Sequence, residues 1–475
     1  MKKGIITTYV LIFGAIFLIL LGGLLGFILL QLRVANQKIS WQESLNIAEA
    51  GMQYWRWCLN NEATENCQLE KEYEDVSGNV IGKFQIQFDA NSNCGLLISQ
   101  KIISTGWTFK FPDLKRKISV LYGKESVAKY SYILNSNVWV GSDHIIRGPY
   151  HSNGGIRFDG QNLSTVSSAQ KSWICTSSFG CGPEGIGYGL GLCPLECQII
   201  NKQCVCPGVF STTKVSNRNL FTSPIPQFDF VGITADLSKI KNAANQLGGI
   251  YLPPSSQIQS NGKGWHLIFR NDGKVQAKII TGLAPTNAYS EEEGDHKDYF
   301  TITSESDYQT YDISSSCSAV FVEDNLWPEG FIKGKVIVAS ANLIDSGIDT
   351  DIILQSNIDY TGTGNDGLTL ISERNILIGP NSPDYMTLKG IFIAQKGRFS
   401  RNHYSGNIKE SLQIFGSIIS AGRVETQWVQ TPSGHLISGY RNRETYIDPT
   451  LIYNPSVFTP FISSQFKIVN WAEIK

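Results

Sequence analysis

The chain starts with a long apolar stretch, Ile5 to Leu30, that contains no charged residue and follows Lys2, Lys3 and Gly4. A helix of that length can cross a bilayer. Lysines that flank such a segment tend to stay in the cytoplasm. The pattern therefore predicts a single-pass membrane protein with a lipid-embedded helix over residues 5–32. Its N-terminus is expected in the cytoplasm and its bulk outside it, at the cell surface.

A second apolar pattern continues the predicted helix beyond the membrane. Apolar residues recur at spacings of three and four, which places them on one face of a helix. Asn60 and Asn61 are a plausible end, because asparagine tolerates the left-handed conformation found there. An amphipathic stalk helix is therefore predicted over residues 33–60, with a stripe made of Trp41, Leu45, Ala48, Met52, Trp55 and Leu59.

After the stalk the periodicity changes to that of short strands separated by turn residues. Residues 61–128 predict a small β head, with strand-like runs at Val80–Phe88, Leu96–Ser104 and Lys117–Tyr122. Residues 129–235 form a Gly- and Asn-rich β region with a Cys-rich loop at 175–206. Residues 236–330 are expected to be a linker or insert with one short helix.

Strand-sized apolar runs recur at short intervals over residues 331–425, and most are followed by Gly, Asn, Asp or Ser. This near-repetition predicts an irregular β-solenoid, or parallel β-helix, in which each coil buries its apolar edge on the next. A sandwich of short strands is the alternative. Residues 426–475 are a closing segment whose last strand is expected to cap the solenoid. The predicted class is mainly β with a long N-terminal α-helix.

Composition narrows the partners and the compartment. The formal net charge is −1, with 40 basic and 41 acidic residues, so no nucleic-acid partner is evident. The ten cysteines favour disulfides outside the cytoplasm. Their spacing does not match the usual zinc sets, so no metal is expected, and the pairing stays open. The disulfide candidates are Cys58, Cys67, Cys94, Cys175, Cys181, Cys193, Cys197, Cys204, Cys206 and Cys317.

Several segments resemble a known family. The apolar N-terminus followed by Leu45–Met52 is similar to type IV pilins, and more narrowly to PilX-type pilus-assembly proteins. Ser104-Thr105-Gly106, the stretch 151–160 (HSNGGIRFDG) and the C-terminal stretch 461–473 carry weaker likeness. The resemblance implies a pilin-like α+β head and a prepilin leader over residues 1–4, cleaved between Gly4 and Ile5. It departs at Tyr9, where pilins usually carry glutamate, and an uncleaved anchor is the alternative.

The resemblance also implies a function. It indicates a non-enzymatic accessory, or minor, subunit of a type IV pilus or related pseudopilus, with a role in initiation, tip display and adhesion. Its expected partners are membrane lipid, other pilin-like subunits joined through the N-terminal helix, and a host-cell, surface or glycan ligand. No cofactor is expected.

The alternative is an anchored β-helix enzyme that acts on polysaccharide. Glycoside hydrolysis needs two carboxylates placed for acid and base or nucleophile roles. No paired motif singles out two of the acidic residues, and common nucleotide-binding, hydrolase and protease motifs are absent from the sequence, so no catalytic residue is predicted. The candidates are Asp345, Asp349, Asp351, Asp359 and Asp366.

Three other features invite a functional interpretation, but each has a simpler one. His144 and His151 lack a nearby nucleophile motif, so we expect structural roles, with His151 and Asn153 bonding backbone at a turn. The acidic stretch 290–298 could bind calcium but lacks the alternating ligands of an EF-hand loop. The basic triplet 115–117 is expected to be a solvated strand end.

Overall fold

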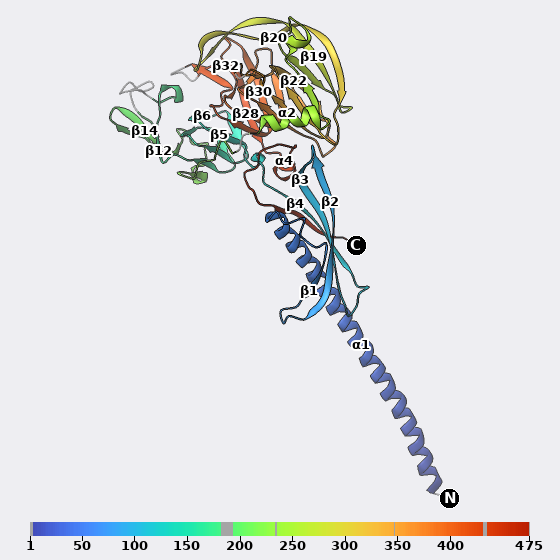
Figure 1. Cartoon of the computed structure of the whole chain (residues 1–475). Helices are drawn as coiled ribbons and strands as arrows, with labels where there is room; N and C mark the ends of the chain where they lie inside the picture. Colours follow the sequence, from blue (N-terminus) through green and yellow to red (C-terminus); the bar gives the residue numbers. More distant parts are fainter. Residues whose placement is uncertain (1–2, 182–192, 233–234, 346, 431–434, 475) are drawn as a thin grey trace. The chain divides into compact units, whose positions relative to one another are not determined.

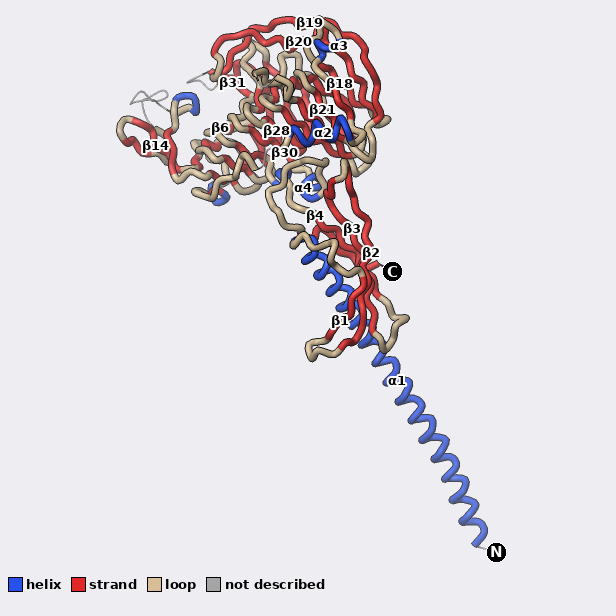
Figure 2. Tube along the Cα trace, viewed as in Figure 1, coloured by secondary structure: helices blue, strands red, loops and turns tan. Residues whose placement is uncertain are grey.

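The computed structural model describes residues 3–181, 193–232, 235–345, 347–430 and 435–474. They form two compact units. The first contains the described residues up to Ala90, then Gln100–Gly123 and the segment from Gln465 onward. The second contains Asn91–Ser99 and Lys124–Ser464. The predicted class, mainly β with a long N-terminal helix, is confirmed (Figure 2).

The first unit is built on one continuous helix, α1 (Lys3–Asn60), which ends at the asparagine predicted to stop it (Figure 1). Residues 6–35 all have exposed side chains, although most of them are apolar. Within the described residues, α1 is the helix that is long and apolar enough to cross a membrane, with a mean hydropathy of 2.7 in its most apolar window. Its N-terminal half therefore presents an apolar surface that this unit does not cover.

The second half of α1 packs against the sheet of the first unit. This sheet has the order β1-β2-β3-β4-β33, from strands β1 (Glu70–Glu74), β2 (Val80–Asn93), β3 (Leu96–Thr108), β4 (Arg116–Gly123) and β33 (Lys467–Ile474). The Tyr122 hydroxyl donates to the Met52 carbonyl oxygen at 2.6 Å, and the Trp55 indole donates to Gln100 at 2.7 Å. The buried helix residues are Ser40, Ser44, Ile47, Ala48, Gly51, Met52, Trp55, Cys58 and Leu59.

One member of the predicted stripe does not belong to it. Trp41 is 45% exposed, and the Arg116 guanidinium lies 4.9 Å from its ring centroid. Helix and sheet instead approach most closely at Gly106, where an added Cβ would lie 2.4 Å from the backbone of Ser44 and Ala48. Small residues on that helix face, and not a large aromatic one, allow this approach. Arg116, from the basic triplet, also forms an ion pair with Glu473 of β33.

The position of β33 corrects the prediction for the C-terminus. The expected cap of the solenoid is instead an edge strand of the head sheet, antiparallel to β4, with Lys467 opposite Gly123. The chain of residues 124–464 thus leaves this sheet at the end of β4 and returns at the start of β33. A strand pattern predicts extended structure but does not state which sheet the strand joins.

The second unit is a solenoid of parallel strands stacked into walls. We call the longest stack wall A. Its strands pair in parallel in this order: β17 (Ile250–Leu252), β21 (Ala319–Val322), β23 (Lys335–Ser340), β26 (Gly367–Ser372), the later parts of β28 (Tyr385–Ala394) and β30 (Ile408–Ser420), then β5 (Tyr132–Leu134), β8 (Tyr150–Ser152), β11 (Val166–Ser168) and β16 (Phe221–Thr222).

Two further stacks complete most coils. Wall B contains β18 (Trp265–Phe269), the start of β22 (Leu326–Ile332), β24 (Ile352–Leu354), β27 (Ile376–Ile378) and β29 (Phe399–Ser400). Wall C contains the end of β22, β25 (Ile358–Tyr360), the early parts of β28 and β30, β32 (His435–Tyr446), β7 (His144–Ile146) and β10 (Gln161–Asn162). A short stack joins β6 (Val138–Val140), β9 (Ile156–Phe158) and β15 (Val209–Phe210).

The coils do not follow the order of the sequence. In wall A the end of β30 pairs with β5, and in wall C β32, which stacks on β30, pairs with β7, so strands from the segment 132–222 extend the solenoid beyond its C-terminal strands. The predicted boundaries at 331 and 425 are therefore wrong, because β-rich residues on both sides of them belong to the same solenoid. Each exposed strand edge is a template for another strand whatever its place in the chain, so stacking order is not set locally.

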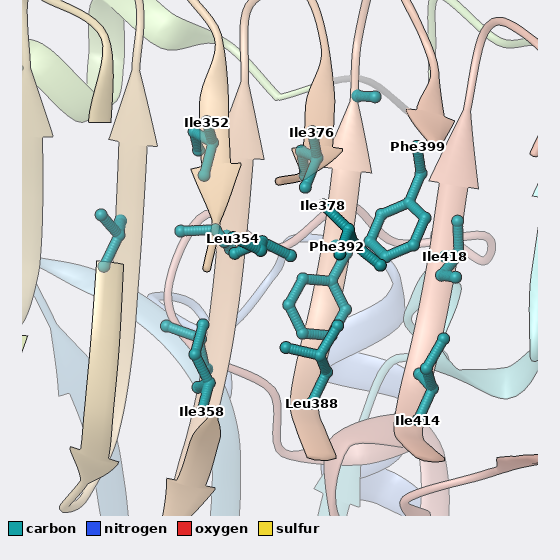
Figure 3. Close-up of a cluster of buried hydrophobic side chains, with 14 of the residues drawn as sticks. Ile352, Leu354, Ile358, Ile376, Ile378, Leu388, Phe392, Phe399, Ile414 and Ile418 are labelled. Carbon is teal, nitrogen blue, oxygen red and sulfur yellow. The ribbon is translucent and has the colours of Figure 1, made fainter. Parts of the chain in front are cut away.

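The interior of the solenoid is a column of apolar side chains. Figure 3 shows Ile352, Ile376 and Phe399 at matching positions of neighbouring coils, and Leu388 beside Ile414. All five are essentially fully buried. Parallel strands buried in this way read as nearly continuous apolar runs, which is the pattern that predicted them.

A strap formed by residues 223–249 returns the chain from the last coil of wall A to the first. Along its described part, the Ile225 amide donates to the Ser168 carbonyl oxygen, and the Asn153 side chain bonds the backbone of Phe228. Farther along, Gln395 donates to the carbonyl oxygen of Ala235. The strap ends in α2 (Leu237–Gln246), whose residues Ile240, Ala243 and Ala244 pack on the apolar outer face of wall A.

A long hairpin, β19 (Lys274–Ser290) and β20 (Gly294–Asp312), lies over wall B. Ile280 of β19 and Phe300 of β20 pack with Trp327 and Ile353 of the wall. Outside the Cys-rich loop, the other elements are β31 (Gln427–Gln430), the short helices α3 (Ser255–Ile258) and α4 (Pro449–Tyr453), and two 3-10 turns at Val127–Lys129 and Arg218–Leu220. A third 3-10 turn, Ser177–Phe179, lies in that loop.

All ten cysteines form disulfides. Cys58 and Cys67 join the end of α1 to the following loop, and Cys94 and Cys317 are joined within the second unit. The Cys-rich loop holds strands β12 (Ser172–Ile174), β13 (Gln198–Ile200) and β14 (Gln203–Pro207) together. Its bonds are Cys175–Cys181, Cys193–Cys204 and Cys197–Cys206. The sulfur atoms of Cys175, Cys181 and Cys206 lie close together, but as disulfide sulfurs they have no thiolate to offer a metal.

Candidate ligand-binding cleft

A cleft of about 600 Å³ lies in the second unit. It lies where β6, β31, the tip of the β19–β20 hairpin and the 3-10 turn Ser177–Phe179 come together. Aromatic and charged side chains share its wall. The residues that matter for its chemistry are Trp139, Asp143, Phe179, Glu291, Arg423, Glu425, Trp428 and Arg443.

Trp139 is held at one side of the cleft by polar contacts at its edge and on one face. Its indole N–H donates to the Asp159 carboxylate at 2.9 Å. The Arg157 guanidinium lies over the ring, 4.2 Å from its centroid, and itself pairs with Asp159 at 2.6 Å. These contacts fix the ring plane while part of the indole lines the cleft.

Trp428 is fixed in a similar way at another side. Its indole N–H donates to the carbonyl oxygen of Arg401 at 2.9 Å. The rings of Tyr289 and His403 meet it edge-on, with centroids 5.7 and 5.8 Å away. Tyr289 and His403 also exchange two backbone hydrogen bonds, of 3.1 and 2.9 Å, which pin the hairpin beside the cleft.

Most charges in the cleft neutralise one another. Arg443, only 8% exposed, makes a bidentate contact with Asp143, with both N–O distances at 2.7 Å. The Arg423 guanidinium forms an ion pair with Glu425 and lies 5.3 Å from the Phe179 ring centroid. Burial lowers the pKa of Arg423, an effect that nearby Glu291 opposes. Both guanidinium groups therefore face a carboxylate of the protein itself.

The five acidic residues considered for catalysis do not meet in this cleft. Asp345 accepts a hydrogen bond from the Gly347 amide and closes a turn. Three others form separate ion pairs, Asp349 with Lys396, Asp351 with Arg374 and Asp359 with Lys389. Each of these three carboxylates is therefore engaged with a different basic side chain.

Asp366, the fifth of them, organises a loop. It accepts hydrogen bonds from the amides of Gly334 and Thr363 and from the Thr361 hydroxyl. Burial opposes its ionisation, but the bonds from Thr363, Gly334 and Thr361 outweigh burial and lower its pKa to about 2. A carboxyl group with such a pKa stays ionised at neutral pH and suits neither general acid nor poised base.

The two histidines have buried hydrogen-bonding roles. His144 contacts the Tyr132 and Thr445 hydroxyls at 3.3 and 3.1 Å, and burial lowers its pKa well below the ordinary value. His151 bonds the side chains of Ser167 and Asn153, at 3.1 and 3.0 Å. The backbone contact expected of His151 is thus made by Asn153, which bonds Phe228 of the strap.

The acidic stretch 290–298 forms the tip of the β19–β20 hairpin. The Asp298 carboxylate, buried to 6% exposure, accepts hydrogen bonds from the Tyr404 hydroxyl at 2.7 Å and from Asn402 at 2.9 Å. His296 lies 3.2 Å from its other oxygen. Through these contacts Asp298 attaches the hairpin to the solenoid.

A half-buried histidine of β18, His266, gives the solenoid a pH-dependent contact. The Nδ1 atom of His266 lies 2.8 Å from Glu305, and Nε2 lies 3.5 Å from Glu329. Burial acts to lower its pKa, but the hydrogen bonds and charges of Glu329 and Glu305 outweigh it and raise the pKa. The contribution to stability is thus full below the unfolded pKa of about 6.5 and is lost as pH rises through the folded value.

Replacing His266 with glutamine is therefore expected to destabilise the protein more in acid than in alkali. We expect a loss of about 1 kcal/mol at pH 5.5, because both carboxylates are partly solvated, and a smaller one at pH 9. Urea unfolding of variant and parent at the two pH values measures this. An equal loss at both would contradict the assignment.

The residues of the cleft were not singled out from the sequence. Asp143 and Arg443 are 300 residues apart, so no local motif joins them. Trp139 and Trp428 each lie in a short strand, where an aromatic residue is unremarkable. One signal for Trp139 was available in the sequence. In Val138-Trp139-Val140 the two valines are buried, so the tryptophan between them points to the other face of the strand, where a large aromatic side chain is partly exposed.

Comparisons with known proteins identify no family. No protein-family model matches the chain, and no curated protein matches it. Among solved structures it is similar to the competence-associated pilin ComZ from Thermus thermophilus, with 12% identity and a TM-score of 0.30. That match covers 92% of this chain and 98% of the other. A similarity at this level supports no functional argument by itself.

Proposed function

We propose that the chain is a membrane-anchored, pilin-like accessory subunit that displays a non-enzymatic binding module outside the cell. In this proposal α1 anchors the protein in the membrane and joins it to other pilin-like subunits of a type IV pilus or related pseudopilus. The solenoid then serves adhesion, at the tip of the filament or in its initiating complex.

The observation that carries the proposal is the organisation of the first unit. One helix has an uncovered apolar half at residues 6–35 and a second half buried on a five-stranded sheet. An uncovered apolar helix surface needs lipid or the equivalent helices of other subunits to cover it. A helix that served only as a membrane anchor would not need to continue into the head. Assembly of subunits through a shared core of packed helices would require this continuity.

The position of the second unit in the chain supports the display role. Because β4 and β33 are neighbours, the long segment between them leaves and re-enters the head at one place. A module inserted in this way adds a large domain without interrupting the helix, and the turn between β2 and β3, Asn91–Ser99, belongs to the same second unit. A module of this size would suit an end of a filament better than its regular interior.

Immunogold labelling of intact cells tests the proposal, with an antibody against the second unit. We expect label on filaments or at their tips, and we expect deletion of the gene to reduce piliation or adhesion. Label spread over the envelope and never on filaments, with unchanged piliation and adhesion in the deletion strain, would refute the pilus role.

Processing at the N-terminus is a separate prediction of the same proposal. Cleavage between Gly4 and Ile5 would give a mature chain that begins at Ile5, in spite of Tyr9. N-terminal sequencing of the protein from membranes measures this, and Gly4→Val should block it. A chain that still begins at Met1 in the parent would contradict processing and favour an uncleaved anchor.

A further inference from the structure

We propose that the cleft between Trp139 and Trp428 binds a neutral, hydroxyl-rich oligosaccharide without cleaving it. This deepens the proposed adhesion function, on which it rests for its biological setting, by assigning the ligand class and the residues that hold it.

The aromatic side chains supply the first part of the argument. The face of an aromatic ring is electron-rich, and the C–H groups on one face of a sugar ring carry the complementary partial charge. Trp139 and Trp428 both line the cleft, and each spends its N–H on the protein, on Asp159 and on Arg401. What they offer a ligand is therefore ring surface held in a fixed orientation, which lowers the entropic cost of binding.

The polar groups supply the second part. Each carboxylate oxygen has two lone pairs, so a carboxylate that already accepts from a guanidinium group can also accept from a sugar hydroxyl. Asp143 and Arg443 already hold each other in a bidentate contact, and Gln427 accepts from Arg443 at 3.2 Å. Arg443 also donates to the Thr426 hydroxyl at 3.3 Å. This network holds the Asp143 carboxylate in place, with its remaining lone pairs available to a ligand, before any ligand binds.

The charge balance selects a neutral ligand over an anionic one. Phosphate or sulfate groups are usually bound by basic residues whose charge is available to them. Here Arg443 is paired with Asp143 and Arg423 with Glu425, while Glu291 adds a further negative charge at the rim. A polyanion would therefore meet a cleft with a small net negative charge and would be disfavoured.

The size of the cleft agrees with a small-molecule site. Its volume of about 600 Å³ lies inside the range of about 300–1,000 Å³ that is usual for pockets that enclose a ligand. It is bordered by the pinned hairpin tip, by strands of the solenoid and by the turn Ser177–Phe179.

A glycan array probed with the full-length protein tests the inference. The protein is kept in a zwitterionic detergent, because a maltoside or glucoside detergent would present sugar to the cleft. The array carries neutral glucose, galactose, mannose and N-acetylglucosamine oligomers beside heparin and polysialic acid. Affinity for the best neutral glycan is then measured in solution by tryptophan fluorescence, and the products are examined for cleavage.

We expect saturable binding of at least one neutral glycan that stays intact. Trp428→Ala and Trp139→Ala should each weaken binding at least tenfold, whereas Trp428→Phe should retain most of it. Trp471→Ala is the matched control, since Trp471 is a 44% exposed tryptophan of β33 in the first unit, and it should leave affinity unchanged. A far-UV circular dichroism spectrum establishes that each variant is folded.

Three outcomes would overturn the inference: binding of none of the neutral glycans, preference for heparin or polysialic acid, or cleavage of the bound glycan. If Trp428→Ala bound the glycan with the same affinity as the parent protein, the cleft would not be the binding site. None of these results would move the label from filaments. Failure of the glycan inference is therefore distinguishable from failure of the pilus proposal.

Discussion

Replacing Gly416 with alanine is expected to destabilise the solenoid by about 3–6 kcal/mol. Gly416 has φ +143°, a conformation that L-residues rarely adopt, and a Cβ there would lie 1.8 Å from the carbonyl oxygen of Gly390. The two glycines pair across β28 and β30, where both strands turn from wall C into wall A. The backbone on each side is held by parallel ladders, so the clash has no flexible side chain to displace.

The matched control is Gly406→Ala. Gly406 also has positive φ, at +69°, but nothing lies within 4 Å of its added Cβ. Alanine there should cost only the conformational strain, about 1–2 kcal/mol. Urea unfolding of the full-length proteins, followed by circular dichroism, measures both. Equal midpoints for the two variants would show that the close contact at Gly416 is relieved at little cost.

Removing the Cys94–Cys317 disulfide is expected to have the second largest effect. The bond closes a loop with a sequence separation of 223 residues. The chain-entropy model assigns such a loop about 5 kcal/mol of stabilisation, acting through the unfolded state. We therefore expect the double variant Cys94→Ala, Cys317→Ala to lower the urea midpoint strongly while the native contacts around it persist.

Those contacts are hydrogen bonds between the same two segments. The Cys94 amide donates to the Ser316 carbonyl oxygen at 2.7 Å, and Asn93 accepts from the Ser318 amide at 3.0 Å. The control is Cys58→Ala, Cys67→Ala, whose bond closes a separation of only 9 residues and should contribute about 2.5 kcal/mol. A larger loss from the short loop than from the long one would contradict the entropic account.

The sequence predicted the stalk well because helices depend on neighbouring residues. The apolar run, the three-and-four spacing and Asn60 are all read within one segment, and α1 ends at that residue. Trp41 shows the limit of the pattern. It shares the apolar spacing, yet the sheet packs instead beside Ser44 and Ala48, where Gly106 allows the two backbones to come close.

The strands were recognised, but their partners were not. The run Ile391–Ala394 lies in the region that predicted repeated strands, and nothing local indicates that β30 separates it from Ile133–Leu134 of β5 in wall A. Hydrogen bonds between parallel backbones are nearly the same for any residues. Only the complete packing of coils, strap and hairpin decides which edges meet.

The sequence by itself determined the long helix, the β-rich remainder and the cysteines available for pairing, because these follow from local periodicity and composition. The tertiary structure alone decided that residues 132–222 follow the C-terminal coil, that β33 returns to the head sheet, and that Asp143 and Arg443 meet beside Trp428. The physical reason is that each of these arrangements is a contact between distant segments, selected by shape and burial over the whole unit and not by any stretch of chain.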